Sequence, residues 1–411
     1  MKPNKILYAI GPGDVINSFN DWQNNQITKT ETSITFSSQF FDFCKRNDIA
    51  FWAISSNSRK ANLKIGNMHV ENRPKSPNGH LSGLNYHVRQ VRYALSLLKS
   101  SVKFNTDLVI IDSGTTHWFM LILFRFFGIK VINNFHTTLW PAGYPPSRFT
   151  ERLISYLDGF YLRWFSNASM GVSPECQRQA VSLAGKELSF YQFRPMYNRG
   201  GFEIYRTPNH ADRPFRIMFA GRIEKNKGVF DILSIAREIK KRSISGIVFE
   251  LCGDGSSTQE LVKMINVQKL ENVVSFNGML TRSDLLAVYN RCHLIIIPTT
   301  HEFNEGFAMV AAEAIIMGRP IISSSVVPAA EVLNEATILA KTSNIDDYTD
   351  KIINIASDTV RYNELCAACE NLQPIFFDRE NSISSSLSKA IKSIWPCWLE
   401  IKSDTIPRGS D

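Results

Sequence analysis

The chain has 411 residues, of which 44% are hydrophobic and 20% are charged, and this composition excludes a disordered or fibrous protein. The length exceeds what one hydrophobic core usually supports, so we expect two domains of about 200 residues each. The formal charge of +8 is uneven, because residues 1–205 hold 23 basic and 13 acidic side chains. Such a basic half attracts polyanions: nucleic acid, an anionic membrane face or a phosphorylated substrate.

Cysteine usage and apolar segments favour a cytoplasmic protein. The seven cysteines lack the dense spacing of a disulfide-stapled secreted domain, so reduced thiols are expected. Cys366 and Cys369 form a C-x-x-C without a second pair of zinc ligands, and a helix carrying two small residues is the preferred interpretation. Residues 6–10 are too short for a signal peptide, and residues 118–127 are too short to cross a bilayer.

Apolar runs of strand length alternate with longer segments of helical periodicity in the first half of the chain, which predicts a parallel sheet of βαβ units. The predicted strands are residues 6–10, 49–55, 108–112, 130–134 and 168–172. The predicted helices are residues 37–46, 86–99, 116–127, 148–165 and 174–183. Residues 194–214 contain three prolines and no apolar periodicity, so they are expected to link two domains.

The second half repeats the alternation of strands and helices. Its predicted strands are residues 216–220, 246–252, 273–276, 293–298 and 320–323, and its helices begin at Val229, Gln259, Arg282, Phe307 and Ala329. Residues 379–401 regain helical spacing and are expected to return to the first domain. The fold class is therefore α/β, with two Rossmann-like domains that face a cleft. We expect the first in residues 1–200, the second in 201–380, and a C-terminal helix in 381–411.

Two glutamates eight residues apart, Glu305 and Glu313, form the strongest candidate site. Glu305 follows the strand predicted at 293–298, and Gly306 allows a turn into a helix whose free amides can accept a phosphate. One carboxylate could bind sugar hydroxyls and the other a ribose diol. The alternative is a pair of solvated surface residues, but Glu313 lies in an apolar run, where a carboxylate is costly without a partner.

A basic loop follows the strand predicted at 216–220. Ligands of open α/β sheets bind outside the carboxyl ends of strands, which is where this loop would lie. Arg222 and Lys227, placed after Gly221 and before a helix, can neutralise a diphosphate, a role that a metal would otherwise fill. A solvated turn is the alternative.

Two glycine turns and one histidine give weaker signals. Gly11 and Gly13 follow the first strand, and Gly253 and Asp254 follow a strand of the second domain, where glycine lets a backbone approach a ligand. His136 should lie at the rim of the first domain, either as a polar contact to a sugar or as a structural donor. Zinc-hydrolase, P-loop and nucleophile-elbow motifs are missing from the sequence.

Together the motifs of residues 215–333 resemble family 4 of the retaining glycosyltransferases, which have the GT-B fold. The resemblance rests on Ala-Gly-Arg at 220–222 with Lys227-Gly228, on Gly253-Asp254-Gly255, and on the Glu305 to Glu313 spacing followed by Gly318-Arg319-Pro320. Ala308 departs from it, because the family commonly has a glycine there. The first half matches more loosely, through Gly11, Gly13 and His136.

The resemblance implies a metal-independent, hexosyltransferase-type enzyme without a cofactor. It would move a sugar, with retention, from a nucleotide-diphosphate sugar to a saccharide or lipid-linked saccharide in surface polysaccharide or glycolipid assembly. Arg222 and Lys227 would hold the diphosphate, Glu305 and His136 would contact the sugar, and Glu313 would bind the ribose. The other donor-binding positions implied are Gly11, Gly13, Gly221, Gly253, Asp254, Leu280, Gly306, Phe307 and Ala308.

Two other functions remain open: a sugar-nucleotide epimerase with a similar cleft, and a non-catalytic subunit that binds nucleotide sugars. Nucleic-acid binding is not expected, because interleaved aromatic and basic motifs are missing. The basic half is most simply explained by an anionic acceptor or by peripheral binding to the inner face of a membrane. The base, the sugar, the acceptor and the oligomeric state stay open.

Overall fold

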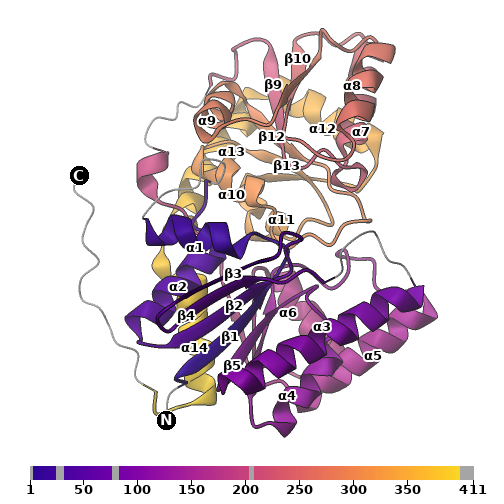
Figure 1. Ribbon diagram of the computed structural model, residues 1–411. Coiled ribbons are helices and arrows are strands. Elements are labelled where there is room, and N and C mark those ends of the chain that lie inside the picture. Colours follow the sequence, from indigo (N-terminus) through magenta and orange to yellow (C-terminus); the bar gives the residue numbers. More distant parts are fainter. Residues whose placement is uncertain (1–2, 25–31, 76–82, 203–207, 399–411) are drawn as a thin grey trace.

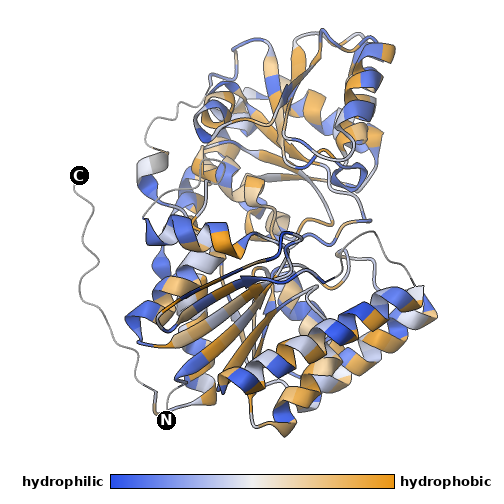
Figure 2. Ribbon diagram, in the orientation of Figure 1, coloured by the Kyte–Doolittle hydropathy of each residue, from blue (hydrophilic) through white to orange (hydrophobic). Residues whose placement is uncertain are grey.

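The structure, a computed structural model, describes residues 3–24, 32–75, 83–202 and 208–398. Two α/β domains are stacked on one another, with the first domain in indigo to magenta and the second in orange (Figure 1). Each domain is built on a sheet whose central strands are mostly apolar and whose outer helices mix polar and apolar residues (Figure 2). This is the predicted fold class.

The first sheet has eight strands in the order β3-β4-β2-β1-β5-β6-β7-β8, and only the β3–β4 pair is antiparallel. Its strands are β1 (Lys5–Ile10), β2 (Ala50–Ser55), β3 (Ala61–Ile65), β4 (Met68–Asn72), β5 (Leu108–Asp112), β6 (Lys130–Phe135), β7 (Ala168–Gly171) and β8 (Phe190–Gln192). The sequence predicted the five central strands. It missed β3, β4 and β8, which are short strands with polar residues and lack the apolar run of a buried strand. Of these, β3 and β8 form the two edges of the sheet.

Helices cover both faces of the first sheet (Figure 1). They are α1 (Val15–Gln23), α2 (Phe36–Arg46), α3 (Gly83–Phe104), the 3-10 helix η1 (Trp118–Leu121), α4 (Ile122–Phe126), α5 (Phe149–Trp164) and α6 (Pro174–Ala184). The long helix predicted at 116–127 is wrong, since it is split into η1 and the short α4. Asp158 of α5 accepts a hydrogen bond from the Phe119 amide, and this bond connects η1 to α5.

The second sheet has six parallel strands in the order β11-β10-β9-β12-β13-β14. They are β9 (Phe215–Ala220), β10 (Ile247–Cys252), β11 (Val274–Gly278), β12 (Leu294–Ile297), β13 (Ile321–Ser324) and β14 (Thr337–Ala340), the last of which was not predicted. The helices are α7 (Val229–Lys241), α8 (Thr258–Val267), α9 (Arg282–Arg291), α10 (Met309–Ile316), α11 (Ala329–Val332), α12 (Ile345–Ser357) and α13 (Thr359–Leu372).

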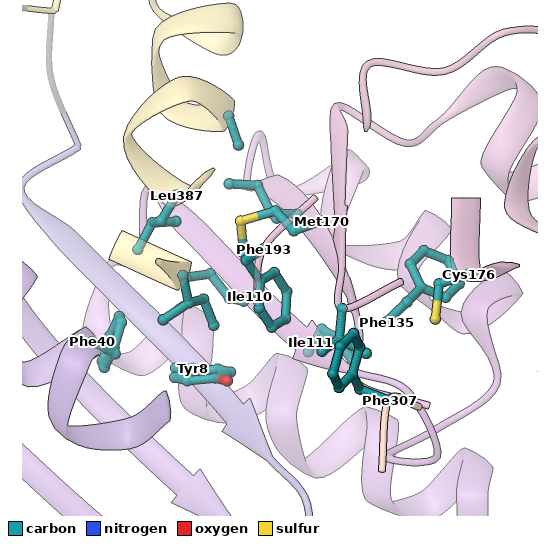
Figure 3. Close-up of a cluster of buried hydrophobic side chains, with 14 of the residues drawn as sticks. Tyr8, Phe40, Ile110, Ile111, Phe135, Met170, Cys176, Phe193, Phe307 and Leu387 are labelled. Carbon is teal, nitrogen blue, oxygen red and sulfur yellow. The ribbon is translucent and has the colours of Figure 1, made fainter. Parts of the chain in front are cut away.

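Helix α14 (Ile383–Ile394) lies on the first domain, although it follows the second domain in sequence. The Ser384 hydroxyl donates to the Gln39 carbonyl at 2.9 Å, and the Ser386 hydroxyl donates to the Gln192 carbonyl at 2.7 Å. Figure 3 shows Leu387 of this helix beside the core of the first domain. The domain boundaries expected at residues 200 and 380 remain predictions.

The hydrophobic core of the first domain continues into the second. Figure 3 shows Phe307, from the loop before α10, in one cluster with Phe135 and Ile111 of the first sheet. Cys366 and Cys369 lie on α13 as free thiols, which confirms the helical interpretation of that motif. Within the described ranges, no helix combines the length and apolar character needed to span a bilayer.

Candidate active site

The loops after β9 and β12 start side by side, because these two strands pair in parallel at the centre of the second sheet. From β9 the sheet continues through β10 to β11 on one side, and from β12 it continues through β13 to β14 on the other. The strand order therefore reverses between β9 and β12. In open α/β sheets, ligands bind outside the carboxyl ends of the strands at this reversal. The basic loop and the Glu305 loop therefore meet where a ligand is expected.

Lys227 and Glu305 form a direct ion pair between these two loops. Lys227 ends the 3-10 turn η3 (Lys225–Lys227), and its Nζ lies 2.5 Å from Glu305 Oε2. Thr299 donates to the same carboxylate oxygen at 3.3 Å. The two charged side chains are only 15% and 10% exposed, so each requires the other as a partner.

Phe303 contacts both basic side chains, Arg222 and Lys227. Its ring centroid lies 3.8 Å from Lys227 Nζ and 5.2 Å from Arg222 Cζ, distances at which cations interact with an aromatic face. Arg222 is half-exposed and also donates to Glu224 at 3.0 Å. The structure thus brings together Arg222, Lys227 and Glu305. Phe303 was not among the residues predicted from the sequence, although an aromatic residue inside an otherwise polar loop is a signal that could have indicated it.

The turn after β10 packs directly on the basic loop. Gly253 has φ 135°, and a Cβ there would lie 1.8 Å from the Gly221 carbonyl oxygen, so only glycine fits. Asp254 accepts hydrogen bonds from Thr258 and from the Gly255 amide, at 2.7 and 2.8 Å, and these bonds lower its pKa. The Asp254 side chain therefore caps its own turn in this structure.

Helix α10 begins at Met309, two residues later than expected. Ala308 has φ 70°, in the left-handed region that favours glycine and in which an alanine is strained. The Phe307 side chain is buried and stacks edge-on against Phe376, so only its backbone is near the start of the helix. The departure from glycine at position 308 thus leaves the sharp turn intact.

Glu313 on α10 has two hydroxyl partners. Thr32 of the first domain donates to Oε1 at 2.5 Å, and Tyr289 of α9 donates to Oε2 at 2.9 Å. Burial raises the pKa of Glu313, and these two hydrogen bonds oppose that rise. The expectation that Glu313 has polar partners is confirmed. Neither Thr32 nor Tyr289 was expected, because a hydroxyl far away in the sequence gives no local pattern.

His136 lies at the carboxyl end of β6 in a polar cluster. Its Nε2 is 2.8 Å from Asn134 Nδ2, 3.2 Å from the Tyr8 hydroxyl and 3.3 Å from Asp112 Oδ1. The half-buried ring also packs on Phe36, with 4.6 Å between the centroids. These partners, which were not predicted from the sequence, hold the imidazole in place at the carboxyl edge of the first sheet.

The two domains touch between His136 and Glu305. A Cβ on Gly306 would lie 1.8 Å from the His136 carbonyl oxygen, and the Thr138 amide donates to the Glu305 carbonyl at 3.4 Å. On the same side of the molecule, Arg178 of α6 forms a bidentate ion pair with Glu331 of α11. The carboxyl edges of the two sheets therefore face each other.

The remaining candidate residues lie on turns at these edges. Gly11 and Gly13 follow β1, and a Cβ on either would meet no atom within 4 Å, so the turn borders open space. Leu280 is half-buried in the turn between β11 and α9. Among the residues that the structure describes, no cluster of three or more His, Cys, Asp or Glu side chains is placed to hold a metal ion.

Residues 202–371 match a family model described as glycosyl transferases group 1. The glycogen synthase of Mycobacterium tuberculosis is 28% identical to this chain over 132 residues, which are 31% of each protein. The matched segment therefore spans about a third of that relative's length.

Two solved structures cover nearly the whole chain. Sucrose-phosphate synthase from Thermosynechococcus elongatus aligns with a TM-score of 0.71 at 14% identity, over 96% of this chain and 99% of that one. HepE of Anabaena, solved in complex with UDP, aligns with a TM-score of 0.64 at 15% identity, over 95% and 100%. These likenesses confirm the GT-B fold.

Proposed function

Since residues 202–371 match the family model of the group 1 glycosyl transferases and the chain has the GT-B fold, we propose that the protein transfers a sugar from a nucleotide-diphosphate sugar to an acceptor hydroxyl with retention. The observation that carries this proposal is the Lys227–Glu305 ion pair beside Arg222 and Phe303. It lies where the order of the second sheet reverses and where the first domain faces it.

The donor diphosphate is expected to bind between Arg222, Lys227 and the start of α10. Charge develops on the leaving diphosphate as the bond from the anomeric carbon to its oxygen breaks, and preorganised cations stabilise that charge. The acceptor oxygen bonds to the same face of the carbon, and its proton passes to a diphosphate oxygen. The two basic side chains supply the neutralisation, so we propose chemistry that does not depend on a metal.

Donor binding would redistribute the contacts of Glu305. Its carboxylate accepts hydrogen bonds from Lys227 and Thr299. A diphosphate that competes for the Lys227 ammonium would leave the carboxylate available to sugar hydroxyls. His136, held by Tyr8 and Asn134, would contact the sugar from the first domain.

The remaining roles follow the positions of the turns. Glu313 would exchange its Thr32 and Tyr289 partners for the ribose hydroxyls of the donor. The backbone near Leu280 would contact the base, and the turns at Gly253 and at Gly11 would approach the donor from the two sheets. A uridine nucleotide is the first donor to test, because HepE was solved with UDP.

We propose a saccharide or lipid-linked saccharide acceptor in surface polysaccharide or glycolipid assembly, reached by a cytoplasmic protein at an anionic membrane face. The support is the uneven charge, with 23 basic against 13 acidic residues in residues 1–205.

A panel of nucleotide sugars and free nucleotides tests the donor site, because a ligand that binds only the folded state raises the melting temperature. We expect one nucleotide to stabilise the protein, and stabilisation by none would contradict the proposal. Incubation with donor alone separates the two alternatives. An epimerase would convert the donor without an acceptor, and a non-catalytic subunit would bind it and leave it unchanged with every acceptor.

A further inference from the structure

Helix α5 exposes a stripe of large apolar side chains. Phe149, Leu153, Tyr156, Phe160 and Trp164 recur at intervals of three or four residues and therefore lie on one face of the helix. They are between 46% and 81% exposed. The opposite face carries the buried residues that pack on the sheet.

The helices beside α5 extend this surface. Phe126 and Phe127, at the end of α4, are exposed. Helix α4 lies on the same side of the sheet as α3 and α5 (Figure 1). The outer face of α3 alternates apolar and basic residues, with Val88, Arg92, Leu95, Lys99 and Val102 all exposed. Figure 2 shows the mixture of apolar and polar positions along α3 and α5. We call these exposed residues of α3, α4 and α5 the outer face.

The charge of the outer face has one predominant sign. Helix α3 contains four basic residues and no acidic one. Arg152 and Arg163 flank the stripe on α5. Of the two acidic residues of that helix, Asp158 is buried, and Glu151 is half-exposed and pairs with Arg148. Arg163 and Lys186 also lie over the Trp164 ring, at 5.3 and 5.9 Å from its centroid.

This combination fits a lipid surface better than water or a protein partner. Monomeric proteins rarely expose contiguous apolar patches of this kind without a binding function. Trp and Tyr favour the interface between headgroups and acyl chains, and clustered Lys and Arg are attracted to anionic lipids. A helix with large apolar residues on one side and basic residues beside them lies in the plane of such an interface.

A cavity of the first domain borders the outer face. Its volume is about 580 Å³, and Tyr156, Phe160 and Trp164 line one side of it. Trp140, Pro145 and Pro146 line the other side, in the loop that leads from His136 to α5. A membrane-bound acceptor held at the outer face would therefore be close to the loop that carries His136.

We propose that the outer face docks the protein on an anionic bilayer, with the aromatic side chains of α5 and α4 in the headgroup region and the basic side chains of α3 and α5 on lipid phosphates. This inference deepens the membrane part of the proposed function. It does not depend on the transfer chemistry.

Co-sedimentation with vesicles tests the proposal, using phosphatidylglycerol mixed with phosphatidylcholine, and phosphatidylcholine alone, at low salt. We expect the wild-type protein to bind the anionic vesicles and to be released as salt screens the charges. The combined variant Tyr156→Ser, Phe160→Ser, Trp164→Ser should lose binding. The charge variant Arg92→Gln, Lys99→Gln should bind at least about tenfold more weakly, because two basic side chains that attract anionic lipids are lost.

Matched controls are available in the second domain, where Val267 and Val360 are each 71% exposed. The double variant Val267→Ser, Val360→Ser should bind vesicles like the wild type. Stabilisation by nucleotide should be unchanged in all variants, so a failure of the donor proposal is recognised separately. Equal vesicle binding by the wild type and the α5 variant would overturn the inference. So would a wild-type dimer that the α5 variant converts to a monomer.

Discussion

Thr32 of the first domain donates a hydrogen bond to the Glu313 carboxylate of the second, with 2.5 Å between Thr32 Oγ1 and Glu313 Oε1. This contact joins residues 281 positions apart and, with the Tyr289 hydroxyl, satisfies a carboxylate in an apolar helix. The residue proposed to bind ribose is thus held by the other domain.

Replacing Thr32 with valine is expected to lower the free energy of unfolding by about 1–3 kcal/mol, because a buried carboxylate loses one of its two partners. Urea denaturation at neutral pH measures this change. Thr150→Val, at an exposed position of α5, serves as a control that should leave stability near the wild-type value. Equal stability of the two variants would show that the interdomain contact does not support Glu313.

Replacing Lys227 with alanine is expected to reduce turnover by about a hundredfold or more, since a preorganised cation beside the leaving diphosphate is lost. Product formation from the stabilising nucleotide sugar, with a panel of acceptors, measures the effect. Lys225 is a neighbouring lysine on the same turn that pairs with Glu260 instead. Lys225→Ala should keep near-normal turnover, and equal rates for the two alanine variants would argue against the assignment of Lys227.

Replacing Gly306 with alanine is expected to push the domains apart, because the added methyl group would lie 1.8 Å from the His136 carbonyl oxygen. Small-angle X-ray scattering should show a larger radius of gyration, and transfer activity should fall. Gly66→Ala, in the turn between β3 and β4, meets no atom within 4 Å and should keep the wild-type dimensions. A Gly306 variant with unchanged dimensions would mean that the interface relaxes locally.

Stability is expected to fall in acid because of His293. Its Nδ1 accepts a hydrogen bond from the Arg216 amide at 3.0 Å, its Nε2 lies 3.2 Å from the Asn209 carbonyl, and burial lowers its pKa to about 4 from the ordinary 6.5. Between pH 6.5 and 4 the unfolded chain gains a proton that the folded chain does not bind. Unfolding therefore becomes easier as the pH falls, by about 1 kcal/mol at pH 5 after allowance for solvent screening.

Urea denaturation of the wild type and of His293→Gln at pH 7 and pH 5 measures this dependence. The variant should lose less stability between the two values, although not all of the dependence should disappear, because burial also lowers the pKa of His117 to about 4. His301→Gln, at an exposed position, should keep the wild-type dependence. A His293 variant with the wild-type dependence would contradict this account.

The sequence predicts the central strands well because they are buried on both faces and read as unbroken apolar runs. The edge strand β3 and its neighbour β4 carry polar residues, so their pattern does not differ from that of a loop. The helix at 116–127 was predicted from its apolar content. Its division into η1 and α4 accompanies a hydrogen bond from the Phe119 amide to Asp158, which lies far along the chain.

The candidate site was predictable where its residues share one loop or follow adjacent strands. Lys227 and Glu305 could be placed together because the carboxyl ends of parallel strands lie at one edge. Thr32 could not, since its contact with Glu313 depends on how one domain sits against the other. The partners of His136 come from three separate strands, and only the order of the sheet brings them together.

The position of α14 has a consequence for biosynthesis. Its anchors on the first domain, Gln39 and Gln192, lie 345 and 194 residues before the serines that bind them. A ribosome releases this helix only after the entire second domain has emerged, so strands β7 and β8 of the nascent first domain lack the cover of α14 until then. Domains generally fold in the order of synthesis, and exposed apolar surface invites aggregation. The first domain is therefore synthesised first but completes its folding only after α14 has been made. Chains that end before residue 383 should need protection by chaperones.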